Sequence, residues 1–238
     1  MQSDTNINTA TEKYTKSFLE KLHSNKNLDV PFIMRGLHCA IEYHGDQMRK
    51  SGEPYVMHPI AVAEMMMDAG LDTNCIVAGL LHDTIEDTTL TLEEISQMFN
   101  PRVAQMVQRV TRIKDPMTGH KPTVEEKLLE TYQHKDYESL LLKIYDRIHN
   151  MQTIDAMKPT KQKEIAEETI YGFLLYALEC NNSYALEKAL NELCHITITK
   201  SQNPSVLQRL YPKLFEHDAQ SGDLSPLPVF VFPDSQNT

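Results

Sequence analysis

The chain has 238 residues, of which 23 are basic and 33 acidic, so its net charge is −10. General nucleic-acid binding is not expected, because it draws its affinity from Lys and Arg contacts to phosphates. No apolar run approaches the roughly 20 residues that span a bilayer, and the first residues lack the basic start and apolar stretch of a secretory signal. We therefore expect a cytoplasmic protein that binds neither nucleic acid nor a membrane.

Cysteine usage agrees with that location. Cys39, Cys75, Cys180 and Cys194 form no C-x-x-C pair and stand among apolar neighbours. Free cysteine is among the most buried residue types, so buried, reduced thiols are the favoured interpretation. Two disulfides are also compatible with the sequence, because four cysteines allow three pairings.

Helical patterns dominate the sequence between its two ends. The chain has only 8 glycines and 12 prolines, and apolar residues recur at helical spacing. Pro31 suits the first turn of a helix that runs to about residue 49, and residues 91–94 (TLEE) and 123–126 (TVEE) are capping boxes that start two more. Further helices are predicted over residues 136–151, 160–174 and 183–197. No stretch alternates as a strand would, so we predict an all-α fold.

The two ends of the chain differ from its middle. Residues 1–10 are polar, and residues 218–238 combine polar residues with several prolines, a composition that does not build a packed element. No repeat with a period of roughly 20 to 50 residues is present. We expect a flexible N-terminus over residues 1–10, a single domain over 11–217 and a loose C-terminal tail over 218–238.

A group of titratable residues follows the apolar segment at residues 76–81. It consists of His82, Asp83, Glu86 and Asp87, and on a helix the spacing of three and four residues would place them on one face. Burying adjacent imidazole and carboxylate groups is costly unless a partner compensates them, and a divalent cation accepts both as ligands. The alternative is a solvated helix end with incidental charges.

Asp146, His149 and Asn150 form a second polar group. Their spacing of i, i+3 and i+4 places them on one stripe of a helix that is otherwise apolar around Ile144 and Ile148. Such a stripe usually faces a site or another buried polar group. A helix N-cap network or a surface stripe is the alternative.

A third segment carries positive charge. Arg49 and Lys50 stand where a predicted helix gives way to a glycine-containing loop, with Ser51 next and His58 beyond it. This is a good setting for an anionic ligand. The alternatives are a solvated Arg-Lys surface and a structural histidine at position 58.

Taken together, these segments resemble the hydrolase domain of the RelA/SpoT homologues, members of the HD phosphohydrolase superfamily. The resemblance rests on residues 44–55 (HGDQMRKSGEPY), His58-Pro59, residues 80–88 (LLHDTIEDT) and residues 146–151 (DRIHNM), and it extends over about residues 30–195. It implies a helical bundle of the HD-domain type with roughly nine to eleven helices. It also implies a stand-alone hydrolase without synthetase activity.

The resemblance further implies a reaction. One Mn²⁺ ion would support removal of the 3′-pyrophosphate from the alarmones ppGpp and pppGpp, which gives GDP or GTP. The expected metal ligands are His58, His82, Asp83 and Asp146. Glu86 and Asp87 would position or deprotonate the attacking water.

Expected substrate contacts follow from the same resemblance. Arg49, Lys50, Ser51, Asn150 and Thr153 match family positions that hold the nucleotide. Because a chain with a net charge of −10 repels a polyanion, a local cationic rim is needed. Lys143 and Arg147 are further candidates for that rim.

Several departures from the family pattern leave the substrate open. Tyr145, Gln152 and Arg109 replace the usual Ala, Arg and Gly, and residues 171–173 (YGF) replace a usual Tyr-Ala-Pro. None of them removes an expected ligand or catalytic carboxylate, but they bear on the choice between guanine and adenine. The alternatives are hydrolysis of ppApp-type alarmones or NADPH at the same metal site, a non-catalytic alarmone-binding regulator, and a helical interaction protein with incidental motifs. A homodimer is compatible with the long apolar helices.

Overall fold

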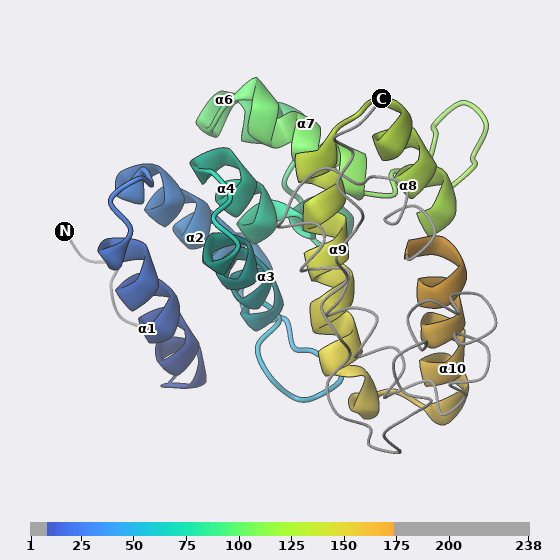
Figure 1. Cartoon of the computed structure of the whole chain (residues 1–238), viewed down its shortest axis with the longest axis horizontal. Coiled ribbons are helices and arrows are strands. Elements are labelled where there is room, and N and C mark those ends of the chain that lie inside the picture. Colours follow the sequence, from blue (N-terminus) through green and yellow to red (C-terminus); the bar gives the residue numbers. More distant parts are fainter. Residues whose placement is uncertain (1–8, 174–238) are drawn as a thin grey trace, which may run out of the picture.

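The computed structural model describes residues 9–173 of the protein. Within that range the protein is helical (Figure 1), and the one strand-like contact is an isolated bridge between Met48 and Pro54. The helices are α1 (Thr9–Ser24), α2 (Val30–His44), α3 (Met57–Asp68), α4 (Thr73–Leu81), α5 (Thr84–Asp87), α6 (Leu92–Met98), α7 (Pro101–Val110), α8 (Val124–Gln133), α9 (Tyr137–Gln152), η1 (Ile154–Ala156), α10 (Pro159–Glu168) and the π-helical turn η2 (Thr169–Phe173).

The predicted all-α fold is confirmed over these residues. The helix predicted over 183–197 and the tail predicted over 218–238 lie outside the described residues, so the domain limits 11–217 stay a prediction. No helix in the described range is long and apolar enough to cross a membrane. Cys39 and Cys75 are buried free thiols, as expected, and the other two cysteines lie outside that range.

Most of the helices begin at a side-chain cap. Both predicted capping boxes form, with Thr91 and Thr123 accepting a hydrogen bond from the backbone amide three residues on and the glutamate at that position accepting one in return. The side chains of Asp29, Asp72, Asn100 and Asp136 cap α2, α4, α7 and α9. Because the first amides of a helix have no partner within it, these residues set where each helix begins.

One helix ends earlier than its sequence pattern predicts. The prediction for α2 extends to about residue 49, but the helix ends at His44, where Gly45 takes a φ of +47° that interrupts the helical path. Residues 45–56 therefore form a loop, and this loop carries Arg49. The helix predicted over 160–174 is confirmed as far as the described residues extend: α10 runs to Glu168, and the π-helical segment η2 continues it to Phe173.

Helix α4 forms the centre of the core. Every residue from Cys75 to Leu81 is buried, and the helix packs mainly against α2, α3 and α7. Gly79 allows the approach of α3, because a Cβ at this position would lie 3.0 Å from the Met66 sulfur. Since α4 has no solvent-facing side, its C-terminal end delivers the next residue, His82, into the interior.

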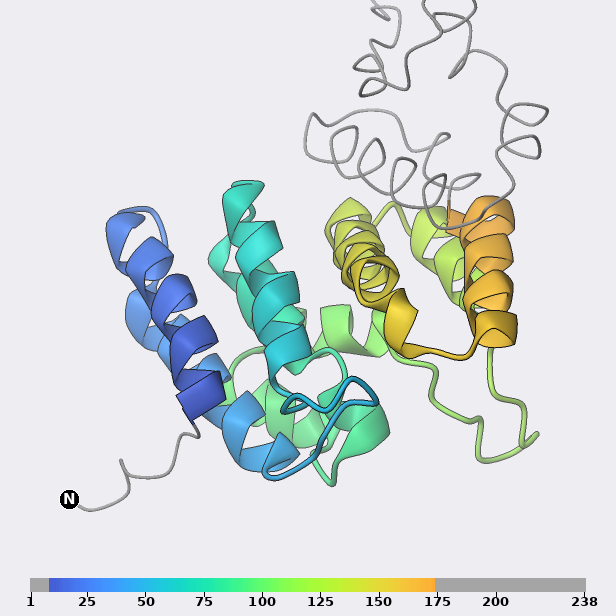
Figure 2. The ribbon, with the colours of Figure 1, turned by 90° about the horizontal axis from the view of Figure 1, so that it is seen from below.

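Helix α9 packs against α3 and α4 and approaches the loop at residues 45–56 (Figure 2). Its N-terminus is fixed by Asp136, which accepts two hydrogen bonds from Arg102, at 2.8 and 2.7 Å, and pairs with Nε of Arg109 at 2.9 Å. Arg109, one of the departures from the family pattern, therefore anchors the helix that carries Asp146.

We predict that Asp136→Asn lowers the free energy of unfolding at pH 7 by about 1–3 kcal/mol, the range for hydrogen bonds to charged groups. The asparagine keeps a helix cap, but it removes the charge and replaces one of the two oxygens that accept from Arg102 with an N–H donor. Burial alone would raise the pKa of Asp136, but the hydrogen bonds from Arg102 hold it below its ordinary value. The stabilisation is thus complete at neutral pH and is lost as the pH falls below about 4.

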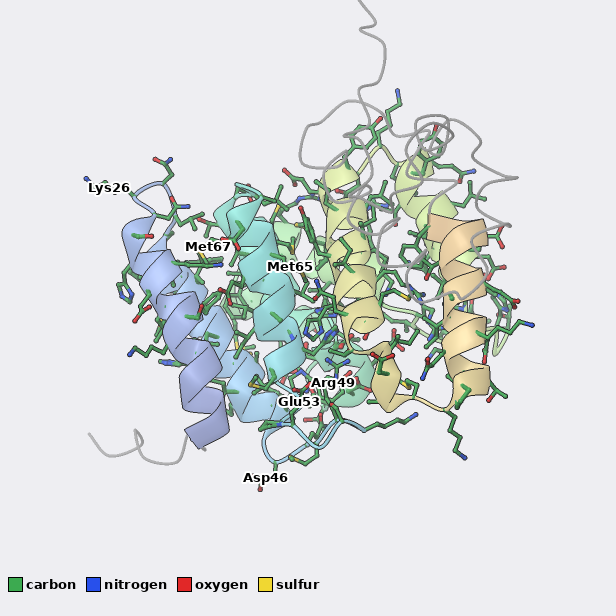
Figure 3. The ribbon with its side chains drawn as sticks, turned by 60° about the horizontal axis from the view of Figure 1, so that its bottom comes forward. Lys26, Asp46, Arg49, Glu53, Met65 and Met67 are labelled. Carbon is green, nitrogen blue, oxygen red and sulfur yellow. The ribbon has the colours of Figure 1, made fainter. Side chains whose placement is uncertain are left out.

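Urea unfolding of the wild type and the variant at pH 7 and pH 3 measures this difference. Asp46→Asn serves as the control, because the Asp46 side chain points away from the protein (Figure 3). A difference in unfolding free energy that stays the same at both pH values would contradict the assigned role of the charge.

Candidate metal and nucleotide site

Four side chains from three helical segments converge on one point in the interior. His58 lies in the first turn of α3, His82 and Asp83 follow the last residue of α4, and Asp146 lies in the middle of α9. Nε2 of His58 is 3.2 Å from Oδ1 of Asp146 and 3.5 Å from Oδ2 of Asp83. Nε2 of His82 is 3.2 Å from Oδ1 of Asp83 and 3.7 Å from Oδ1 of Asp146. The structure thus brings together all four predicted metal ligands.

The hydrogen bonds of His82 show which of its nitrogens faces this cluster and is available to a metal ion. Nδ1 lies 2.8 Å from the carbonyl oxygen of Gly79, and a carbonyl oxygen only accepts, so Nδ1 carries a proton. Nε2 is buried and has no hydrogen-bond partner. A buried polar atom without a partner needs an explanation, and a metal ligand is a sufficient one here.

The charges of the cluster also call for a cation. Burial disfavours the charge on His82, but the carboxylates of Asp83 and Asp146 outweigh that effect and raise its pKa to about 9. Without a metal ion the Nε2 of this ring therefore carries a proton at neutral pH, and a bound cation would take the place of that proton. Burial likewise opposes ionisation of Asp146, whereas Lys143 and the two histidines hold its pKa well below the ordinary value. His58, His82 and Asp83 offer ligand atoms within 4.8 Å of one another. Two imidazoles and two carboxylates form a donor set that suits a divalent transition metal, so the residues present fit the metal.

Asp87 and Asp83 are joined by the hydroxyl of Tyr55. The Tyr55 oxygen lies 2.7 Å from Oδ2 of Asp87 and 2.9 Å from Oδ2 of Asp83. Burial, reinforced by the two carboxylates, raises the pKa of Tyr55, so the side chain stays a phenol. Its ring stacks on His44 with 4.8 Å between centroids. Tyr55 therefore holds a predicted catalytic carboxylate beside a predicted metal ligand.

Glu86, the other predicted catalytic residue, is held from a different direction. One of its carboxylate oxygens accepts a hydrogen bond from the backbone amide of Arg112 at 2.9 Å, and the other pairs with Lys121 at 3.0 Å. Both partners belong to the segment between α7 and α8. The sequence pattern places His82 and Glu86 on one helical face, but α4 ends at Leu81 and α5 begins at Thr84, so the two lie on either side of a helix break.

A cavity of about 290 Å³ lies next to the four predicted metal ligands, which we call the metal cluster, because Tyr55 lines the cavity and contacts Asp83. Arg49 contributes to its wall and lies 3.2 Å from Oδ1 of Asn150 and 3.5 Å from Oγ1 of Thr153. In Figure 3 the Arg49 and Glu53 side chains lie near each other below α3. The residues that line the cavity are Met48, Arg49, Lys50, Ser51, Tyr55, Asn150, Thr153, Ala156 and Met157. Five of the predicted substrate-binding residues therefore line one cavity.

The structure does not bring Lys143 and Arg147 to the wall of this cavity. Lys143 pairs with Asp146 at 2.9 Å, which directs its charge toward the metal cluster. Arg147 is buried, pairs with Glu168 of α10 and lies 4.3 Å from the centroid of the Phe173 ring. The expectation that Arg147 belongs to a substrate rim does not agree with this placement, because its guanidinium joins α9 to α10 and η2.

Sequence reasoning assigned no role to His149, although it placed this residue on the polar stripe of α9. Nδ1 of His149 lies 2.7 Å from Nδ1 of His58 and 3.2 Å from Nη1 of Arg49. Burial, reinforced by His58 and Arg49, lowers the pKa of His149 to about 3, so the ring is neutral. The polar stripe of α9 was the sequence signal for His149. It could not show that His58 and Arg49, which are distant in the sequence, are its partners.

Comparison with known proteins assigns this fold and site to a family. The HD domain family profile matches residues 36–177, which is more than half of the chain. The protein therefore belongs to the HD domain family.

Curated relatives narrow the comparison. The guanosine-3′,5′-bis(diphosphate) 3′-pyrophosphohydrolase of Aquifex aeolicus is 40% identical over 162 residues, which is 67% of this chain and 23% of the relative. The GTP pyrophosphokinase of Myxococcus xanthus is 39% identical over 158 residues, 64% of this chain and 21% of the relative. These names confirm the resemblance to the RelA/SpoT homologues. The chain spans less than a quarter of the length of these two proteins.

A solved structure shows a related fold. It is of a metazoan orthologue of SpoT that is described as hydrolysing ppGpp and as playing a role in starvation responses. The match covers 68% of this chain and 93% of that one, with a TM-score of 0.54 and 23% sequence identity. At this identity the likeness concerns the fold.

We predict that the protein binds one divalent cation per chain and that Asp146→Asn lowers its affinity for Mn²⁺ at least tenfold. The variant loses an anionic ligand at a buried site, where the cation has little solvent to replace it. Titration of free Mn²⁺ by electron paramagnetic resonance measures the affinity, and Asp46→Asn is the control. Equal Mn²⁺ affinity in the wild type and Asp146→Asn would remove Asp146 from the metal site.

Proposed function

We propose that this protein is a Mn²⁺-dependent hydrolase that removes the 3′-pyrophosphate from ppGpp and pppGpp to give GDP or GTP. The observation that carries the proposal is that the cavity and the metal cluster share side chains. Tyr55 lines the cavity and contacts Asp83 and Asp87. Arg49 also lines the cavity and contacts His149, the neighbour of His58. A nucleotide in this cavity would have its phosphates next to the metal ligands.

The names of the relatives support the choice of substrate. The Aquifex aeolicus protein carries the name of the proposed activity, and its match covers 67% of this chain. The name pyrophosphokinase, which other relatives carry, belongs to proteins of which this chain spans about a fifth. We do not extend that activity to this chain. A cytoplasmic location, expected from the sequence, and a homodimer, with which the sequence is compatible, stay predictions.

His58, His82, Asp83 and Asp146 would hold the metal ion. When bound, such an ion lowers the pKa of a coordinated water and neutralises the charge that develops on the attacked phosphorus. Mn²⁺ suits this mixture of imidazole and carboxylate donors. The buried Nε2 of His82, which has no hydrogen-bond partner and faces the carboxylates of Asp83 and Asp146, supports a metal at this position.

Glu86 and Asp87 would orient the attacking water and take its proton. The Tyr55 hydroxyl contacts both Asp87 and Asp83, so Asp87 lies close to the proposed metal ligands. A water bound near those ligands would therefore be within reach of the Asp87 carboxylate. Glu86 is held by the Arg112 amide and by Lys121, which limits the directions its carboxylate can take. A positioned carboxylate that accepts a proton in the transition state typically accelerates a reaction by about 10²–10⁴-fold.

The loop at residues 45–56 would supply the cationic contacts to the nucleotide. The Arg49 guanidinium is fixed by His149, Asn150 and Thr153 and is thus organised before a ligand enters. Fixing a side chain beforehand reduces the entropy lost on binding. Lys50 lines the same cavity and is exposed, so its ammonium group can reach a phosphate. These contacts would overcome the repulsion from a net charge of −10.

We predict that Glu86→Gln lowers kcat for ppGpp hydrolysis by about 10²–10⁴-fold, because an amide cannot accept the proton. Its affinity for Mn²⁺ should stay within about threefold of the wild type, since it is not among the proposed ligands. Stopped assays of pyrophosphate release give kcat, and Glu125→Gln on the exposed side of α8 is the matched control. Wild-type turnover by Glu86→Gln would show that this carboxylate is not the base.

The substrate itself is tested by a panel of ppGpp, pppGpp, ppApp and NADPH. We predict the highest kcat/KM for the two guanosine alarmones in the presence of Mn²⁺. The ratio of kcat/KM values is the quantity to compare, because it measures the specificity of an enzyme for one substrate over another. EDTA should abolish the activity, and added Mn²⁺ should restore it. A higher kcat/KM for ppApp or NADPH would replace the proposed substrate, whereas alarmone binding without pyrophosphate release would indicate a regulator. Activity that EDTA leaves unchanged would rule out the metal.

A further inference from the structure

We propose that His149 is a positioning residue for the metal site: it fixes the tautomer and orientation of His58, and Arg49 of the cavity wall fixes His149 in turn. The three side chains form a hydrogen-bonded row from the cavity to the cluster. Nη1 of Arg49 lies 3.2 Å from Nδ1 of His149, and the same nitrogen lies 2.7 Å from Nδ1 of His58. The inference rests on the metal site of the proposed function.

Arg49 decides which way the hydrogen bonds of this row point. A guanidinium group has only N–H donors and no acceptor. Nδ1 of His149 therefore accepts from Arg49 and carries a lone pair rather than a proton. Without Arg49, the contact between the two Nδ1 atoms could have its proton on either ring.

The tautomer of His58 follows from that of His149. Because Nδ1 of His149 carries no proton, Nδ1 of His58 must be the donor across the 2.7 Å contact, and the single lone pair of His149 is shared between this bond and the longer, 3.2 Å contact with Arg49. In the neutral ring the lone pair then lies on Nε2, the nitrogen that is 3.2 Å from Asp146 and 3.5 Å from Asp83. His149 thus directs the metal-binding lone pair of His58 into the cluster, although it contributes no ligand itself.

The two predicted histidine ligands are oriented by different kinds of group. His82 donates from Nδ1 to the backbone carbonyl of Gly79, and no substitution removes that acceptor. The acceptor for His58 is a side chain, so it can be changed without touching any ligand. Loss of an outer partner of a metal-binding histidine typically lowers metal affinity by about 10–100-fold. We expect a loss of that size when His149 can no longer accept.

The experiment compares two substitutions at His149 with a matched control. In His149→Leu the acceptor is lost, whereas in His149→Asn the side-chain oxygen can take the place of Nδ1. His134→Leu is the control, because His134 is exposed and bonds only to the backbone of its own helix. Electron paramagnetic resonance of free Mn²⁺ measures the metal affinity, and circular dichroism checks that each variant folds.

We expect Mn²⁺ affinity to fall about 10–100-fold in His149→Leu and to return to within about threefold of the wild type in His149→Asn. A role in packing alone would not be rescued by the smaller asparagine. Equal Mn²⁺ affinity in His149→Leu and the wild type would overturn the inference and leave the proposed function standing. A wild-type protein that binds no Mn²⁺ would overturn both.

A second measurement needs no variant. In the wild-type protein loaded with diamagnetic Zn²⁺, long-range ¹H–¹⁵N spectra should show a slowly exchanging proton on Nδ1 of His58. A His58 ring with its proton on Nε2 would overturn the inference whatever the variants do.

Discussion

The meeting of two aspartates and two histidines at one largely buried point is the constraint on which the rest of the structure depends. Asp146 and both histidines have less than a tenth of their surface exposed, and dehydrating such groups is costly without a compensating charge. The fully buried helix α4 places His82 and Asp83 there, α3 adds His58, and α9 adds Asp146. The helices must therefore keep their mutual positions for the four side chains to meet, and the caps and the Asp136 pairs serve that purpose.

Helix α9 connects this cluster to the cavity. Asp146, His149 and Asn150 follow one stripe of the helix, and each faces a different part of the site: the cluster, the His58 ring and the Arg49 guanidinium. The loop at residues 45–56 closes the arrangement from the other side, since it carries both Arg49 and Tyr55. In the proposed function, ligand binding and metal binding would depend on neighbouring atoms of the same few residues, which is what a metal-assisted reaction on a bound phosphate requires.

Local signals in the sequence were sufficient for the all-α class, for several of the helices and for part of the site, but α1, α3 and α7 were not predicted. The capping boxes at Thr91 and Thr123 were predicted correctly because they depend on residues three apart. The convergence of the ligands came from a family resemblance, since no local rule brings His58 to Asp146 across 88 positions. The early end of α2 was missed because it depends on the φ of Gly45, and the direction of Arg147 because its partner Glu168 lies on another helix. The tautomer of His58 is set by a residue 91 positions away, so it could be read only from the folded protein.

The central claim is that one metal ion is held by side chains from α3, α4 and α9 beside the nucleotide cavity. The most direct measurement is an anomalous difference map, recorded near the manganese absorption edge, from crystals grown with Mn²⁺. The account predicts a single strong peak per chain within bonding distance of Nε2 of His58, Nε2 of His82 and the carboxylates of Asp83 and Asp146. A map with no peak among these four side chains, or with the ion bound elsewhere in the molecule, would contradict it.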